Sequence, residues 1–181
     1  MDISRGELRR VGDEWQVQFE RRIPAPQAKV WGAITGPGAM TRWFDETHMP
    51  DPLASGGEIR FVHTMAGVES RGYVTAVEAP RLLEFVWRSS FGPDARMSFE
   101  VLADGEESRL VLRQQLSDLA VAARSLAGWH VSLDKLQGVL GENASGQPGW
   151  AELFEQVYLP SVAGVGLSVP QAGAPAPKTT S

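Results

Sequence analysis

The stretch LAVAARSLAGWHVSLDKLQGVL, residues 119–140, decides the fold that this sequence predicts. It is long and helix-prone, and its large apolar side chains recur at spacings of three and four residues: Leu126, Trp129, Leu133, Leu136 and Leu140. The pattern predicts one long helix with a single apolar stripe. Such a stripe has to be buried against another apolar surface, which the remainder of the chain must supply.

Alternating apolar and polar residues earlier in the chain predict antiparallel strands. Residues 6–23 alternate around the turn Gly12-Asp13, which is typical of a hairpin or of one long bent strand. About five strands with short connections follow between residues 57 and 116, joined at one point by the hairpin turn Asp104-Gly105. Two short helices separated by Gly36-Pro37-Gly38 are expected between the first strand and this meander.

An antiparallel sheet has one apolar face that needs a cover, and one helix is too narrow to cover a wide sheet. We therefore expect an α+β fold: a curved antiparallel sheet of six to seven strands wrapped around a long C-terminal helix, with two short helices after the first strand. This geometry predicts a cavity between sheet and helix. Its expected lining is Phe61, His63, Phe85, Trp87, Phe99, Leu112, Gln114, Trp129 and Leu133, with Trp43 and Phe44 at the rim.

Composition excludes several classes of function. The net charge is −5, so no basic face for nucleic acid is expected, and no apolar run approaches the ~20 residues of a membrane span. The chain has no cysteine, which excludes disulfides and thiolate ligands and is consistent with a cytoplasmic location. We expect one domain over residues 1–160 and a disordered Ala/Gly/Pro-rich tail over residues 161–181.

Several fragments in this order resemble the SRPBCC or START-like helix-grip superfamily. They are FERRIPAPQAKVWGAIT, RWF, GGEIRF, RGYVTAVEAPRLLEFVW and GWHVSLDKLQGVL. More closely, they are similar to the branch named for the C-terminal domain of the activator of the heat-shock protein 90 ATPase. The resemblance covers roughly residues 7–142, which is most of the chain.

The resemblance implies a helix-grip fold and a small hydrophobic ligand in the cavity beneath the long helix. Some members are cyclases or hydrolases. Many members of this branch carry a histidine near the end of the last strand, where this sequence has Gln114 in RQQLSDL. Glutamine forms hydrogen bonds but cannot serve as a general base near neutral pH, so no catalytic role is expected at this position.

The segment RWFDETHMPD, residues 42–51, gathers possible metal ligands or acid–base groups: Asp45, Glu46, His48 and Asp51. A metal site needs several ligands that converge on one point, and four polar residues on a loop between prolines need not converge. We favour a solvated loop, pinned by the inward-facing Trp43 and Phe44, and expect no metal and no cofactor.

Two histidines remain. His63 lies on the cavity face of its strand by parity, either as a satisfied core residue or as a hydrogen-bond partner of the ligand. His130 lies off the apolar stripe of the long helix, so solvent exposure is expected. Gln114 should point inward, either toward the ligand or to hold the helix.

The favoured function is therefore binding of a small apolar or amphipathic molecule, without catalytic residues. One alternative is an enzyme of the cyclase or hydratase type, with His63 as acid or base and Glu69 or Glu58 as its carboxylate partner. No serine lies in a G-x-S-x-G turn and no cysteine exists, so nucleophilic catalysis is poorly supplied. The other alternative is a co-chaperone-like module that contacts a chaperone, which would require an exposed apolar patch.

Overall fold

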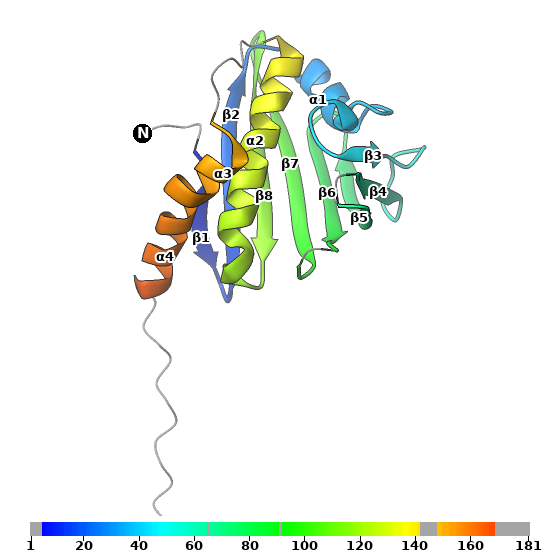
Figure 1. The fold of residues 1–181 in the computed structure, drawn as a ribbon. Coiled ribbons are helices and arrows are strands. Elements are labelled where there is room, and N and C mark those ends of the chain that lie inside the picture. Colours follow the sequence, from blue (N-terminus) through cyan, green and yellow to red (C-terminus); the bar gives the residue numbers. More distant parts are fainter. Residues whose placement is uncertain (1–4, 65, 91, 142–147, 169–181) are drawn as a thin grey trace, which may run out of the picture.

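One antiparallel sheet of eight strands carries the fold and curves around a long helix (Figure 1). The structure is a computed structural model that describes residues 5–64, 66–90, 92–141 and 148–168. The strands are β1 (Glu7–Val11), β2 (Glu14–Ile23), β3 (Glu46–His48), β4 (Glu58–His63), β5 (Val68–Glu78), β6 (Leu82–Arg88), β7 (Ala95–Asp104) and β8 (Glu107–Leu116). The predicted fold class is confirmed.

The spatial order of the strands is β1-β2-β8-β7-β6-β5-β4-β3. The β1–β2 hairpin forms one edge, and the chain then crosses to the other edge and returns strand by strand until β8 pairs with β2. The sheet has eight strands rather than the expected six to seven, because residues 7–11 and 46–48 each form a short strand. Strand β3 lies in the segment that was expected to be a loop.

The crossover from β2 to β3 contains the two short helices, α1 (Gln27–Thr35) and η1 (Met40–Arg42). Both follow the second strand rather than the first, because residues 7–23 form a hairpin and not one bent strand. The indole Nε1 of Trp43 donates a hydrogen bond to the carbonyl oxygen of Ala33 at 2.9 Å, which ties the end of η1 to α1. This tie fixes the backbone position of the residues that follow Trp43.

The long helix α2 (Ala122–Leu140) follows a single turn of 3-10 helix, η2 (Leu119–Val121). The side chain of Asp118 accepts a hydrogen bond from the backbone N–H of Ala120 at 2.8 Å and so caps this start. Gly141, with φ of 109°, ends the helix in a left-handed conformation that favours glycine. The five residues of the predicted apolar stripe are all buried, with at most 6% of each exposed.

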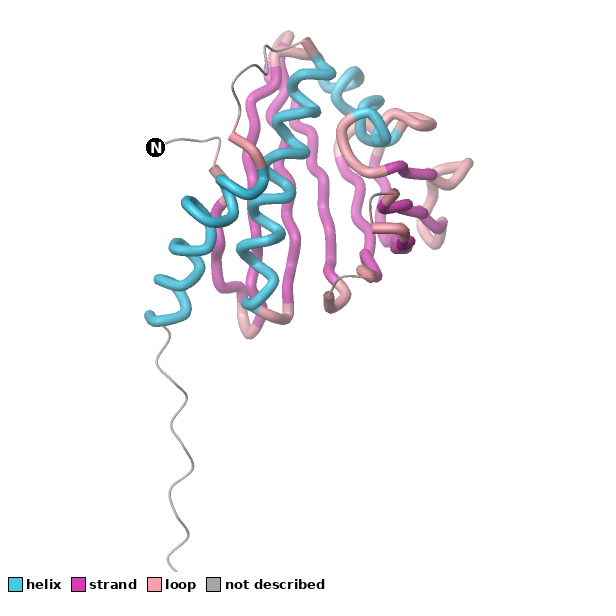
Figure 2. Tube along the Cα trace, viewed as in Figure 1, coloured by secondary structure: helices cyan, strands magenta, loops and turns pink. Residues whose placement is uncertain are grey.

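Helix α2 lies across β2, β8 and β7, and the strands β6 to β3 lie beyond the width that it covers (Figure 2). The register of β5 against β6 shifts between Val74 and Ala76, and a bulge of this kind increases the local bend of a strand. The bend brings the far half of the sheet around toward the side of α2. No helix in the described part of the chain is long and apolar enough to cross a membrane.

A second helical run packs beside α2 at its β1–β2 flank (Figure 1). It consists of α3 (Trp150–Glu152), η3 (Leu153–Tyr158) and α4 (Leu159–Ser168). Leu153, Tyr158 and Val162 are buried. Helix α4 crosses the expected start of the tail at residue 161, since Val162 packs against the core. The remainder of the expected tail, residues 169–181, lies outside the described residues.

A buried polar network joins this C-terminal run to α2 and β2. A guanidinium nitrogen of Arg21 lies 3.6 Å from an Asp134 carboxylate oxygen, and both side chains are almost fully buried. His130 Nδ1 lies 2.7 Å from the hydroxyl of Tyr158, which accepts a hydrogen bond from the backbone N–H of Gly6 at 3.0 Å. The expectation that His130 is exposed is wrong, because Tyr158 covers the flank of α2 where it lies.

Burial changes the pKa of two groups in this network. It raises the pKa of the Asp134 carboxyl above its usual 3.8, and the neighbouring Arg21 guanidinium offsets only part of this rise. Burial also raises the pKa of the Tyr158 hydroxyl above 10.0, against the lowering effect of the bond from Gly6. The network therefore holds the phenol neutral and makes the Asp134 carboxylate costly to ionise.

Replacing Tyr158 by Phe should destabilise the fold by about 1–3 kcal/mol, because Gly6 N–H and His130 each lose a partner in a buried place. Urea denaturation gives the free energy of unfolding. The matched control is Tyr73→Phe, the other tyrosine of the chain, which lies on β5 away from this network and should change stability by less than about 0.5 kcal/mol. Equal effects of the two substitutions would contradict the role of the network.

The stability difference between the wild type and Asp134→Asn should fall as pH rises. A raised pKa means that the folded state binds the proton more tightly than the unfolded chain, whose aspartate titrates near pH 3.9. The contribution is complete below that pH, is lost as pH passes through the higher folded-state pKa, and is constant above it. Denaturation of both proteins from about pH 3 to pH 7 measures this. A difference that grows with pH would show that the attraction of Arg21 outweighs burial.

Candidate functional site

A pocket of about 640 Å³ opens along the flank of α2 that faces β6. The flank of α2 forms one wall, and the other walls come from the segment after η1, from β4 and β6, and from the end of β8. The C-terminal run covers the opposite flank and reaches this pocket only at Trp150. The pocket lies where the sheet extends beyond α2, so that the helix no longer covers the apolar face of the sheet.

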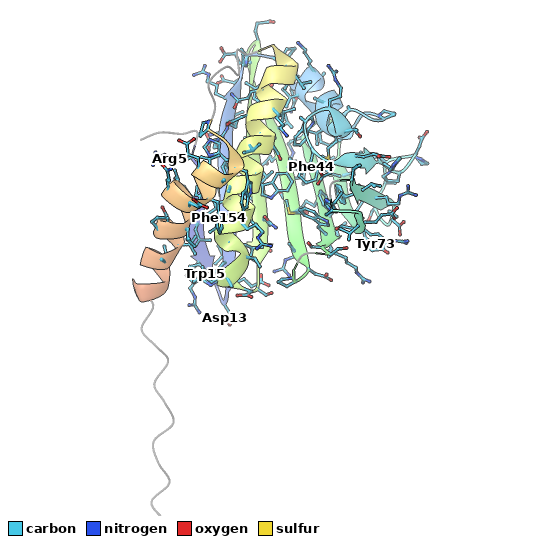
Figure 3. The ribbon with its side chains drawn as sticks, viewed as in Figure 1. Arg5, Asp13, Trp15, Phe44, Tyr73 and Phe154 are labelled. Carbon is cyan, nitrogen blue, oxygen red and sulfur yellow. The ribbon has the colours of Figure 1, made fainter. Side chains whose placement is uncertain are left out.

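Five large aromatic side chains line the pocket: Trp43, Phe44, Trp87, Trp129 and Trp150. Phe44 reaches from the crossover toward α2 (Figure 3) and stacks on Trp129, with ring centroids 4.9 Å apart and planes inclined by 7°. Its ring also meets Trp87 edge to face at 5.9 Å. Aromatic pairs in these geometries attract one another beyond the effect of area burial, so Phe44 bridges helix and sheet across the pocket.

His63 and Asp45 form the polar side of the pocket. The Nδ1 atom of His63 lies 2.6 Å from an Asp45 carboxylate oxygen, and its Nε2 atom lies 2.8 Å from the hydroxyl of Ser70. The Ser70 hydroxyl accepts a hydrogen bond from the backbone N–H of Ser90 at 3.2 Å, which leaves its own proton for His63 Nε2. A neutral His63 then carries its proton on Nδ1 and donates it to Asp45.

The carboxylate partner of His63 is therefore Asp45 and neither of the two glutamates considered from the sequence. Glu58 pairs with Arg71 at 3.1 Å and Glu69 with Arg60 at 3.8 Å. Both glutamates are exposed, since the alternation of their strands turns them away from the His63 side of the sheet. Register alone could not identify Asp45, which reaches His63 from a separate segment.

The polar segment after Trp43 divides into two parts. Glu46, His48 and Asp51 are exposed, as expected, and His48 Nε2 lies 2.9 Å from a Glu46 carboxylate oxygen. Asp45 departs from the expectation, because it is half-buried and bonded to His63. Within the described ranges no three His, Asp or Glu side chains converge as a metal site would require.

Gln114 fixes α2 to β8. The indole Nε1 of Trp129 donates a hydrogen bond to Gln114 Oε1 at 2.9 Å, and both side chains are buried. The donor must be the indole, so the amide oxygen of Gln114 faces Trp129. Gln114 also lines the pocket, so the two readings left open by the sequence are compatible: its oxygen holds the helix while its amide group borders the pocket.

The structure divides the predicted cavity residues into two groups. Lining the pocket are Trp43, Phe44, His63, Trp87, Gln114 and Trp129. Packed in the core, away from the pocket wall, are Phe61, Phe85, Phe99, Leu112 and Leu133. The second group has the same inward parity as the first, but α2 or neighbouring rings fill the space in front of it. The cavity is a side pocket and does not run the length of the helix.

Sequence reasoning missed the contribution of the α2 flank, which includes Arg124, Gly128 and Lys135. These residues recur at helical spacing beside the apolar stripe, so the signal was present in the periodicity. It could be read only after the pocket was known to lie on this side. Trp150 of α3 also borders the pocket, and no pattern in the sequence indicated this position.

Solved structures with the same fold have low sequence identity to this chain. CalU16 from Micromonospora echinospora is 21% identical, with a TM-score of 0.69 over 87% of this chain and 96% of its own. EF2215 from Enterococcus faecalis, a conserved protein of unknown function, is 19% identical, with a TM-score of 0.72 over 88% and 91%. DynU16, from the dynemicin biosynthetic locus, is 24% identical, with a TM-score of 0.60 over 74% of this chain and 48% of its own.

These likenesses show the fold alone. No curated protein matches the chain. The model of one protein family matches residues 24–141, from the end of β2 to the end of α2. That span holds the crossover, the meander and the long helix, which together build the pocket. The chain belongs to the family of Activator of Hsp90 ATPase homolog 1-like proteins.

Proposed function

We propose that this protein binds a small apolar or amphipathic molecule in the pocket beside α2. The observation that carries the proposal is the pocket itself, about 640 Å³ in volume, with aromatic walls on one side and polar or charged groups at its border. Ligand sites in proteins are typically concave spaces of about 300–1,000 Å³, mostly apolar, with a small number of polar groups that fix orientation. The volume and the aromatic walls of the pocket agree with this description.

The polar groups are suited to orienting a ligand. Asp45 is held by His63, and His63 is held in turn by Ser70, so the carboxylate has a fixed direction before any ligand arrives. A hydroxyl or amine of a ligand could donate to Asp45, and a carbonyl could accept from the Gln114 amide. Groups that are positioned in advance cost less entropy on binding than mobile ones.

Comparison with other proteins supports a small-molecule role at a coarse level. DynU16 shares the fold and belongs to the dynemicin biosynthetic locus. A protein with the same fold therefore occurs in a biosynthetic context, which is compatible with a small-molecule ligand.

The enzyme alternative has one observation in its favour, the hydrogen-bonded pair of His63 and Asp45. Both ring nitrogens of His63 already have partners, in Asp45 and Ser70. A proton transfer would therefore have to use Asp45, which borders the pocket, with His63 as the group that positions it. The co-chaperone alternative stays a prediction drawn from the family resemblance.

Filling the pocket tests the proposal. Gly128 lies on the pocket wall, and a Cβ atom built there meets no other atom within 4 Å. Gly128→Leu should therefore fold well, since leucine favours a helix over glycine by close to 1 kcal/mol. We expect the wild type to bind the neutral fluorescent dye N-phenylnaphthylamine, and the Leu variant to bind it at least about tenfold more weakly, which corresponds to 1.4 kcal/mol.

The matched control is Gly32→Leu. Gly32 is also helical, in α1, its Cβ would also meet nothing within 4 Å, and it does not border the pocket. Dye binding should be unchanged in this variant. A wild type that takes up no dye, or a Gly128→Leu variant that binds as the wild type does, would overturn the proposed function.

A further inference from the structure

The flank of α2 that borders the pocket carries two cations. Arg124 and Lys135 are both exposed pocket-wall residues, with Gly128 and Ser132 between them on the same side of the helix. Eleven residues make three turns of an α-helix, so the two residues have nearly the same direction and lie about 16 Å apart along the axis. The small residues between them leave the space over the aromatic walls open.

These cations differ from most others in the protein. Arg81 and Arg113 both pair with Glu100, and Arg71 pairs with Glu58. Neither Arg124 nor Lys135 has a carboxylate partner within the described residues. The chain has a net charge of −5, so it contains enough acidic residues to pair with every cation. Because these two cations at the border of the pocket have no carboxylate partner among the described residues, the electrostatic potential is positive where a ligand would enter.

The single acidic residue among the pocket-lining residues described is Asp45, on the opposite wall. Its carboxylate faces His63 at 2.6 Å. An anion would be repelled from the Asp45 wall and attracted to the α2 flank, while a hydrogen-bond donor would be attracted to Asp45. The pocket is therefore electrostatically asymmetric: the Asp45 wall is negative, the α2 flank is positive, and aromatic side chains lie between them.

We propose that the ligand of this pocket is an amphipathic organic acid. Its apolar, ring-containing body packs against the aromatic wall in which Phe44, Trp87 and Trp129 touch one another, and its anionic group lies at the α2 flank within reach of Arg124 or Lys135. This inference rests on the proposed function, because it assigns the chemical class of the molecule bound in the same pocket.

A pair of dyes with one ring system tests the assignment. N-phenylnaphthylamine is neutral, and anilinonaphthalenesulfonate has the same rings with one added sulfonate. We expect the wild type to bind the sulfonate up to about fivefold more tightly than the neutral dye, since an exposed ion pair contributes up to about that change and one sulfonate reaches only one of two cations that lie about 16 Å apart. The preference should shrink in about 1 M salt, where the screening length falls to about 3 Å.

The variant Arg124→Gln with Lys135→Gln should lose this preference, so that the ratio of the two dye affinities approaches one. The single variants divide the effect between the two cations. Arg42→Gln is the control, because Arg42 is an exposed cation on η1 that does not border the pocket, and it should change neither dye. Gly128→Leu should weaken both dyes, which shows that the sulfonate binds in the pocket and not elsewhere.

The outcomes separate the two proposals. If the neutral dye binds in the pocket and the sulfonate binds no more tightly, the acid assignment is overturned and the proposed function stands. A sulfonate preference that survives in the double variant also overturns the assignment. If neither dye binds the wild type, the proposed function fails, and the assignment fails with it.

Discussion

Burial of the apolar stripe of α2 against a sheet much wider than the helix is the constraint on which the remaining structure depends. Eight strands at spacings of about 4.8 Å span about 34 Å, while a helix with its side chains is about 10–12 Å wide. One helix therefore covers only part of the apolar face. Curvature of the sheet, the crossover helices and the C-terminal run each cover a further part, and the pocket lies where these covers end.

The two flanks of α2 meet this constraint in opposite ways. On the β1–β2 side, the C-terminal run closes the gap, and a polar network of Arg21, Asp134, His130 and Tyr158 is buried beneath it. Burying charges is expensive unless they are paired, so this flank is held by specific geometry as well as by apolar contact. On the β6 side, Phe44 reaches across to Trp129 and closes the gap only in part. The C-terminal run holds α2 in position from one side. The pocket on the other side can therefore stay accessible without loss of the helix position.

The pocket keeps its shape because its wall residues form hydrogen bonds with residues of neighbouring elements. Trp43 is bonded to Ala33, Trp129 to Gln114, and Asp45 to His63. Each of these bonds joins two different elements, so crossover, sheet and helix are fixed to one another at the site. This arrangement places an aromatic middle between an acidic wall and a cationic flank. The partial cover of the sheet by one helix thus leaves a pocket whose two sides carry opposite charge.

The sequence by itself determined the parts that depend on local periodicity. The apolar stripe of α2, the meander and the inward parity of residues such as His63, Trp87 and Gln114 all follow from spacings within one element, whereas residues 6–23 could be a hairpin or one bent strand. These features predicted a curved sheet around one long helix and most of the aromatic wall of the pocket, and the resemblance of the fragments to a known superfamily implied the helix-grip fold. They also predicted inward positions for Phe99 and Leu112, without telling whether space remained in front of them.

Only the tertiary structure decided which inward residues meet a partner and which meet a pocket. Asp45 and His63 are 18 positions apart on separate segments, and their contact depends on how the crossover returns to the sheet. His130 is buried because Tyr158, 28 positions later, covers it, and Arg21 lies inside because Asp134 on α2 is there to pair with it. Periodicity reports the direction of a side chain relative to its own element. Contact, burial and charge pairing depend on the distance to a second element, and that distance is set only when the whole sheet closes around the helix.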